Sequence, residues 1–126
     1  MQITHYLHTA VLVADIARAE QFYGGVLGLS KIDRSLKYPG AWYELGSIQI
    51  HLIEDKTLQD ETLAPQLQNS EKWGRNPHLA LAVANLEAAK AHLLAQGYPL
   101  QASASGRAAL FTQDPDGNII ELTEVS

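Results

Sequence analysis

The chain has 126 residues, of which 46% are hydrophobic and 18% charged, and it contains no cysteine. This composition indicates a compact globular protein with a hydrophobic core and excludes a disordered or fibrous one. The formal net charge of −5 and the absence of any Lys/Arg run argue against nucleic acid as a partner. Without cysteine, disulfides and thiolate metal ligands are excluded. No apolar stretch approaches the roughly 18 residues of a membrane span, so we expect a cytoplasmic protein with no membrane partner.

The N-terminal stretch predicts a strand followed by a helix. By strand alternation over residues 3–13, His8 lies on the face opposite two valines. Asp15 is the expected N-cap of a helix whose apolar residues recur at helical spacing over residues 16–27. Gly28 is the expected end of that helix.

Three short strands are expected next, broken by Pro-Gly and Gly-Ser turns. They cover residues 29–34, 41–45 and 48–53. In the last of them Gln49 and His51 share one face and aliphatic residues take much of the other. This pattern is typical of a strand that lines a polar pocket and packs its other face on a helix.

The segment over residues 54–77 has no clear hydrophobic period and is expected to be a connector with one helical turn. Connectors of this length often serve as lids or binding loops. Trp73 supplies either an aromatic wall or a plug at the seam between the two halves.

The second half predicts the same order of elements as the first. A strand over residues 78–83 begins with His78, and Asn85 caps a helix that ends at Gly97. Three strands follow, from Leu100, over residues 108–112 and over residues 119–125. A sharp Asp-Pro-Asp-Gly-Asn turn leads into the last strand, where Glu121 points away from the more apolar side.

A shift of 70 residues superimposes the two halves. It pairs His8 with His78 and His51 with Glu121, and it aligns apolar residues of the strands and helices as well. Since 51 − 8 and 121 − 78 both equal 43, each half carries a second possible metal ligand at the same distance from its first His. An internal duplication is the natural interpretation.

Four side chains form a candidate metal site, namely His8, His51, His78 and Glu121. Duplicated halves related by a pseudo-twofold axis would bring all four toward one point. Three imidazoles and a carboxylate suit Fe, Mn, Co, Ni or Zn, whereas the nitrogens disfavour Ca. A strand His taken alone is more often a surface or hydrogen-bonded residue, but equal spacing in two aligned repeats favours a shared site.

Four motifs carry a resemblance to a known family. They are HTAVLVAD over residues 8–15, Phe22-Tyr23 with VLGL over residues 26–29, HLALAV over residues 78–83 and DPDGNIIEL over residues 114–122. With these motifs the chain resembles the vicinal oxygen chelate superfamily, also called the glyoxalase/bleomycin resistance/dioxygenase family, over nearly its whole length.

The resemblance implies an α+β fold in which two tandem βαβββ modules form a cup-shaped mixed sheet with helices on the outer face. One domain would then cover residues 1–126, with module one over about 1–54, a connector over about 55–77 and module two over about 78–126. Members are commonly dimers, with the cup built in one chain or shared, and we expect a homodimer.

The family's ligand positions fall on the four residues of the candidate site, which implies one divalent metal ion as cofactor. Extradiol dioxygenases and fosfomycin-resistance enzymes use a triad that maps onto His8, His78 and Glu121. Glutathione-dependent glyoxalase I enzymes usually carry Glu where this chain has His51, and Arg where it has Leu12. Both differences argue against glutathione in the substrate.

Two functions remain open. The first is a metal-dependent enzyme, a lyase, isomerase or dioxygenase, whose metal binds neighbouring oxygens of a small substrate. Glu121 and His51 are then the candidate catalytic residues for proton transfer. The alternative is a binding or resistance protein that sequesters a small molecule without catalysis. Candidate substrate-binding residues are Gln49, Trp42, Tyr43 and Arg107, the last for an anionic group.

Overall fold

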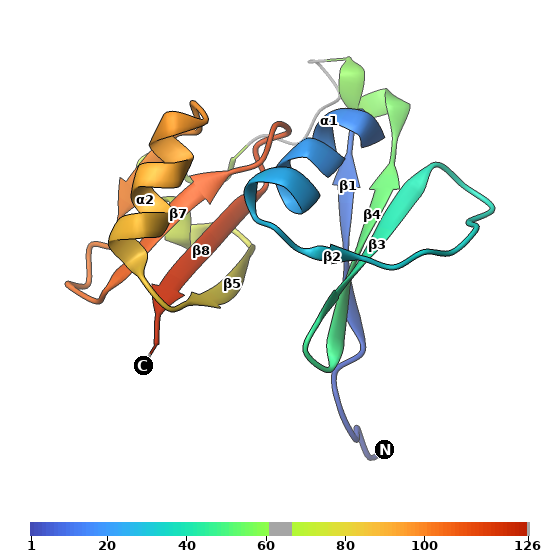
Figure 1. Ribbon diagram of the computed structural model, residues 1–126, viewed down its shortest axis with the longest axis horizontal. Coiled ribbons are helices and arrows are strands. Elements are labelled where there is room, and N and C mark those ends of the chain that lie inside the picture. Colours follow the sequence, from blue (N-terminus) through green and yellow to red (C-terminus); the bar gives the residue numbers. More distant parts are fainter. Residues whose placement is uncertain (61–66, 126) are drawn as a thin grey trace. The chain divides into compact units, whose positions relative to one another are not determined.

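The structure is a computed structural model that describes residues 1–60 and 67–125. The chain divides into two compact units, Met1–Ala64 and Pro65–Ser126, which we call unit one and unit two. Each unit contains one four-stranded mixed sheet and a helix that packs against it (Figure 1). The α+β class and the two βαβββ modules are therefore confirmed.

Unit one follows the predicted order of a strand, a helix and three strands. Its elements are β1 (His8–Val13), α1 (Ile16–Glu20), the π-helix η1 (Gln21–Val26), β2 (Ser30–Lys31), β3 (Gly40–Leu45), β4 (Ile48–Glu54) and the 3-10 turn η2 (Lys56–Gln59). The strand order is β1-β4-β3-β2, with β1 parallel to β4 and the other neighbours antiparallel. The first strand begins later than predicted, and β2 is shorter.

Unit two repeats this order. Its elements are the 3-10 turn η3 (Trp73–Arg75), β5 (His78–Val83), α2 (Leu86–Ala95), β6 (Leu100–Ala102), β7 (Ala109–Gln113) and β8 (Ile119–Glu124). The strand order is β5-β8-β7-β6, with β5 parallel to β8. The register repeats as well, because Ala10 lies opposite His51 and Ala80 lies opposite Glu121.

The helix-facing side of each sheet forms a core of large apolar side chains. In unit one Leu52, Tyr43 and Phe22 are fully buried, and in unit two Leu93 and Ile120 are. Burying one such side chain contributes about 1.5–3 kcal/mol. The other face of each sheet is thereby left for the polar residues that the sequence placed there.

The first helix differs from the prediction. It was expected to stay α-helical through residues 16–27, but α1 ends at Glu20 and continues as the π-helix η1. Both Phe22 and Tyr23 are buried there, with ring centroids 5.0 Å apart at 85°. A Cβ atom on Gly24 would lie 3.2 Å from the hydroxyl of Tyr43, so a glycine at this position leaves room for the Tyr43 ring. The wider π-turn lets two consecutive aromatic residues enter the core.

The duplication extends to the helix N-termini. A carboxylate oxygen of Glu54 accepts a hydrogen bond from the first backbone amide of α1 at 3.0 Å, and Glu124 does the same for α2 at 2.9 Å. Asp15 and Asn85 cap the same two helices through their side chains, as predicted. Glu54 and Glu124, which the 70-residue shift pairs, therefore have a structural role.

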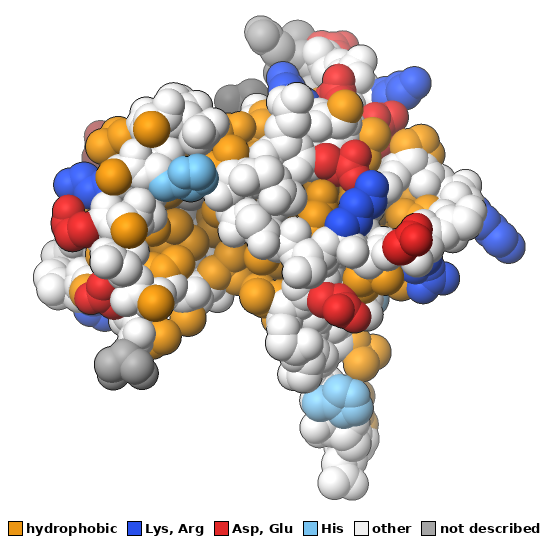
Figure 2. All heavy atoms as spheres, viewed as in Figure 1, with side chains coloured by type: hydrophobic (Ala, Val, Ile, Leu, Met, Phe, Trp, Pro, Cys, Tyr) orange, Lys and Arg blue, Asp and Glu red, His pale blue; other side chains and the backbone are white. Residues whose placement is uncertain are grey.

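The predicted connector falls partly outside the described residues, which omit 61–66. On either side of that gap lie the short 3-10 turns η2 and η3, where one helical turn was predicted. On the face drawn in Figure 2, Lys and Arg side chains are scattered among Asp and Glu, and the described residues form no basic patch there.

Candidate functional site

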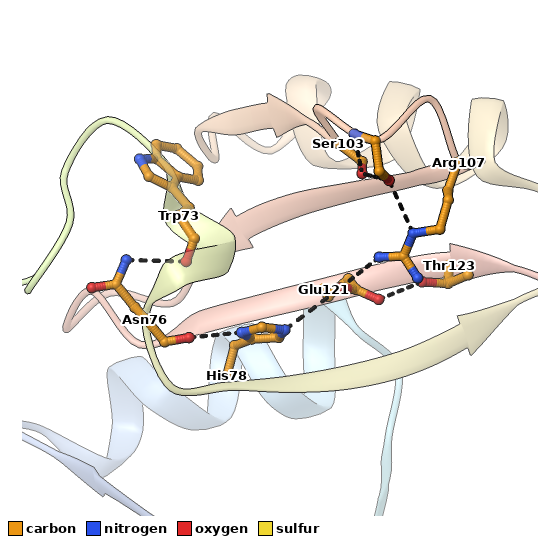
Figure 3. Close-up of polar contacts among 8 residues, drawn as sticks. Trp73, Asn76, His78, Ser103, Arg107, Glu121 and Thr123 are labelled. Atoms are coloured by element: carbon orange, nitrogen blue, oxygen red, sulfur yellow. Dashed lines mark hydrogen bonds and ion pairs between the residues drawn. The ribbon is translucent and has the colours of Figure 1, made fainter.

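The two predicted ligands of unit two lie side by side on one face of its sheet. They come from the parallel neighbours β5 and β8. Nε2 of His78 lies 3.5 Å from Oε1 of Glu121 (Figure 3). Glu121 exposes only 7% of its surface, so its charge is largely shielded from water. The structure thus brings this predicted pair together within one unit.

The imidazole of His78 is held in a defined orientation. Its Nδ1 lies 2.7 Å from the backbone carbonyl oxygen of Asn76. A carbonyl only accepts, so Nδ1 donates to it, and Nε2 is the nitrogen that faces Glu121. A backbone carbonyl on the far nitrogen is the usual way in which proteins orient a metal-binding His.

Asn76 fixes the segment that supplies this carbonyl. Its buried amide donates to the backbone oxygens of Asn69 at 2.8 Å and Trp73 at 3.0 Å, and it accepts from the amide of Asn69 at 3.0 Å. We expect Asn76→Ala to lower the free energy of unfolding by about 2 kcal/mol, because these backbone groups lose their partners. Urea denaturation measures the loss, with the exposed neighbour changed in Gln68→Ala as a neutral control. Equal midpoints for the two variants would show that water replaces the amide.

Glu121 has further partners in unit two. Nη2 of Arg107 lies 3.4 Å from the same Oε1 that faces His78, and the Thr123 hydroxyl donates to Oε2 at 2.6 Å (Figure 3). Nε of Arg107 donates to the Ser105 hydroxyl at 3.1 Å. Arg107 was predicted to bind an anionic substrate group, and here its guanidinium faces a carboxylate of its own chain.

In unit one, His51 lies between two aromatic rings. The His8 ring is 4.0 Å away and tilted by 15°, and the Trp42 ring is 3.7 Å away and tilted by 4°. The three residues come from the neighbouring strands β1, β4 and β3. The guanidinium of Arg34 lies 4.0 Å from the centre of the Trp42 ring. We call these four planar groups the imidazole–indole stack.

His51 is buried and hydrogen-bonded within this stack. Its Nε2 lies 2.8 Å from Oε1 of Gln49, which the prediction had placed on the same face. Burial, and then the charges of His8 and Arg34, lower the pKa of His51 below its ordinary value. The ring is therefore neutral near pH 7, which is the protonation state of a metal ligand or a general base.

The two units differ in how well they fit a divalent metal ion. In unit two, Nε2 of an imidazole and a carboxylate oxygen face each other. In unit one, His8 and His51 have nearly parallel rings, so an ion in the plane of one ring would lie well out of the plane of the other. A nitrogen lone pair lies in its ring plane, so the stacked pair cannot bind one ion together until a ring rotates. Among the described residues, no group of three or more His, Asp or Glu is arranged to hold an ion.

Tyr43 has a structural role instead of the predicted one in the pocket. It is 1% exposed on the helix-facing side of β3, where burial and the charge of Glu20 raise its pKa to about 12. Sequence reasoning missed Arg34, Asn76 and Thr123. Of these, only Thr123 could have been found from the sequence, since strand alternation places it on the same face as Glu121, two residues away.

The sequence matches the family model of the Glyoxalase/Bleomycin resistance protein/Dioxygenase superfamily over residues 5–122. The chain belongs to this superfamily. Superfamily members typically bind a divalent metal ion and small molecules, and they often form dimers. No curated protein matches the sequence significantly.

Solved structures of similar fold span several kinds of superfamily protein. A protein from the mobile metagenome of V. Pseudocholerae is 27% identical, with 100% of this chain and 98% of that chain covered and a TM-score of 0.67. An antibiotic-binding protein from Streptomyces sp. CB03234 is 22% identical, with 100% and 99% covered and a TM-score of 0.70. Lactoylglutathione lyase from Agrobacterium tumefaciens is 20% identical, with 98% and 95% covered and a TM-score of 0.67. The last two likenesses concern the fold alone. None of the helices in the described residues has the length and apolar character needed to cross a membrane.

Proposed function

We propose that this superfamily member is a divalent-metal-dependent enzyme of the glyoxalase/dioxygenase type. Its small substrate would bind the metal ion through two neighbouring oxygens. The observation that supports this most is the pair in unit two, where Nε2 of His78 lies 3.5 Å from Oε1 of Glu121. The carbonyl of Asn76 fixes the orientation of the His78 ring, so Nε2 already faces the carboxylate.

His78 and Glu121 would hold the ion, and His8 and His51 would complete the four-residue set once their rings separate. The ion, one of Fe, Mn, Ni, Zn or Co, would supply Lewis-acid or O₂ chemistry at the substrate oxygens. Glu121 would act as general base through Oε1 once this oxygen is no longer on the ion, because Thr123 occupies Oε2. Neutral His51 is the second group that can move a proton, and Gln49 orients it.

The rest of the proposal concerns the substrate contacts and the assembly. Gln49, Trp42 and Arg107 would contact the substrate, Arg107 after releasing Glu121. The chain would fold as a single domain over residues 1–126 and act as a homodimer in the cytoplasm, with a small molecule as its partner.

Metal content tests this proposal. Protein purified without chelator should hold about one equivalent of a single transition metal by elemental analysis, since structural and catalytic sites bind tightly near neutral pH. His78→Ala should lose it, whereas His5→Ala, which changes an exposed His on the N-terminal segment, should keep it. Iron would direct the assay to O₂ uptake with catechols, and nickel, zinc or manganese to isomerase, lyase or thiol-transfer substrates. Wild-type protein without metal, and with stability unresponsive to added ions, would overturn the proposal.

A sequestering protein is the second candidate function. It is favoured by Arg107 and Thr123, which already partner both oxygens of Glu121. This candidate requires ligand binding that survives EDTA, whereas the enzyme requires activity that EDTA and Glu121→Gln abolish.

A further inference from the structure

Unit one contains a cavity of about 270 Å³ at the Arg34 end of the imidazole–indole stack. One part of its wall is apolar and includes Ile16, Ile32 and Leu36. Another part is formed by Arg34 and Trp42. None of the four proposed metal ligands lines it.

Arg34 lines this cavity, and its N–H groups have no hydrogen-bond partner among residues 1–60 and 67–125. Within residues 1–60 and 67–125, no carboxylate lies within ion-pair distance of it, and its one ring contact is with Trp42 at 4.0 Å. The guanidinium carbon lies over the ring in a cation–π contact, and among the described residues no oxygen accepts from its N–H groups. Within that part of the chain, these donors are available to a ligand.

The Trp42 ring that supports Arg34 is itself fixed. His51 stacks on it at 3.7 Å, and its indole N–H donates to the hydroxyl of Tyr38 at 2.8 Å. A guanidinium held against a fixed ring loses less side-chain entropy when an anion binds. The cavity thus has a pre-organised cationic group.

The charge balance of the cavity favours an anion. Lys31 also lines it, but its ammonium pairs with Glu20 at 2.5 Å, and Glu20 is part of the same wall. With that pair neutral overall, Arg34 leaves one positive charge among the lining residues. A planar carboxylate accepts two parallel N–H bonds from a guanidinium edge, which a neutral group does not match.

We propose that this cavity binds a small organic carboxylate. The carboxylate lies on the donor edge of Arg34, and an apolar, preferably flat body lies against Ile32 and Leu36. The site shares Trp42 with the proposed substrate contacts but uses no metal ligand, so it can be tested in EDTA.

Benzoate and its neutral analogue benzamide are suitable probes. In EDTA buffer, isothermal titration should detect saturable benzoate binding and at least about tenfold weaker benzamide binding, because benzamide lacks the charge. Trp73→Phe leaves Trp42 as the only tryptophan, so benzoate should also change the fluorescence of that variant.

Two variants of Arg34 and one control complete the test. Arg34→Ala should weaken benzoate binding at least about tenfold, and Arg34→Lys should recover only part of it, since an ammonium cannot form the bidentate pair. Lys37→Ala removes a cation of the same loop that does not line the cavity and should leave binding unchanged. No saturable benzoate binding, equal affinity for benzamide or for inorganic phosphate, or full binding by a folded Arg34→Ala protein would each overturn the proposal.

Discussion

A Glu121→Gln protein is expected to bind divalent transition-metal ions at least about 100-fold more weakly than the wild type, a larger loss than changes outside the ligand set cause. The amide keeps the volume of the side chain and can still accept from the Thr123 hydroxyl, which now lies 2.6 Å from Oε2. What it removes is the negative charge beside Nε2 of His78. Calorimetric titration of chelator-treated protein measures the change, with Glu87→Gln on the exposed side of α2 as the matched control.

Arg107→Ala should act in the opposite direction. The guanidinium lies 3.4 Å from the oxygen that faces His78, so it competes with an ion for the same carboxylate. We expect its removal to tighten metal binding about tenfold, since a like charge that close disfavours a second cation. If Glu121→Gln and Arg107→Ala both weakened metal binding, general damage to unit two would be indicated. Unchanged metal binding in Glu121→Gln would exclude Glu121 as a ligand.

In each unit, the two candidate ligands could be predicted to lie close together, because strand geometry determines which side chains are neighbours. Side chains alternate with a period of two, and the first and last strands of each module are parallel neighbours. Two repeats with equal intervals must therefore place His8 near His51, and His78 near Glu121, on the same kind of face. The helix caps at Asp15 and Asn85 follow from equally local chemistry.

The arrangement of rings in unit one could not be predicted in the same way. Register places Trp42 opposite His51, but the stacking depends on side-chain rotamers that no sequence period encodes. Arg34 ends the stretch predicted as a strand over residues 29–34, but β2 stops at Lys31, so Arg34 reaches the stack through the path of the β2–β3 loop. The π-helix likewise depends on tertiary packing of Phe22 and Tyr23, which overrides the helical period.

A side chain at Gly74 is expected to lower the stability of unit two strongly, because Gly74 packs against a ring that contacts His78. A Cβ atom there would lie 2.6 Å from Cζ of Phe111, a ring that is 7% exposed. Phe111 meets the His78 ring edge to face, with centroids 5.5 Å apart. We expect Gly74→Val to lower the free energy of unfolding by about 3 kcal/mol, at the upper end of overpacking costs, since a buried ring cannot easily retreat.

Gly25→Val is the matched control for this change. A Cβ at Gly25 would meet no atom within 4 Å, and its φ is not positive, so we expect a shift of less than about 0.5 kcal/mol. Urea denaturation compares the two variants, and Gly74→Val combined with Phe111→Ala shows whether the loss comes from that contact. If the clash is the cause, the double variant loses less than the sum of the single ones. Additive losses would mean that the cost of Gly74→Val does not arise from its contact with Phe111.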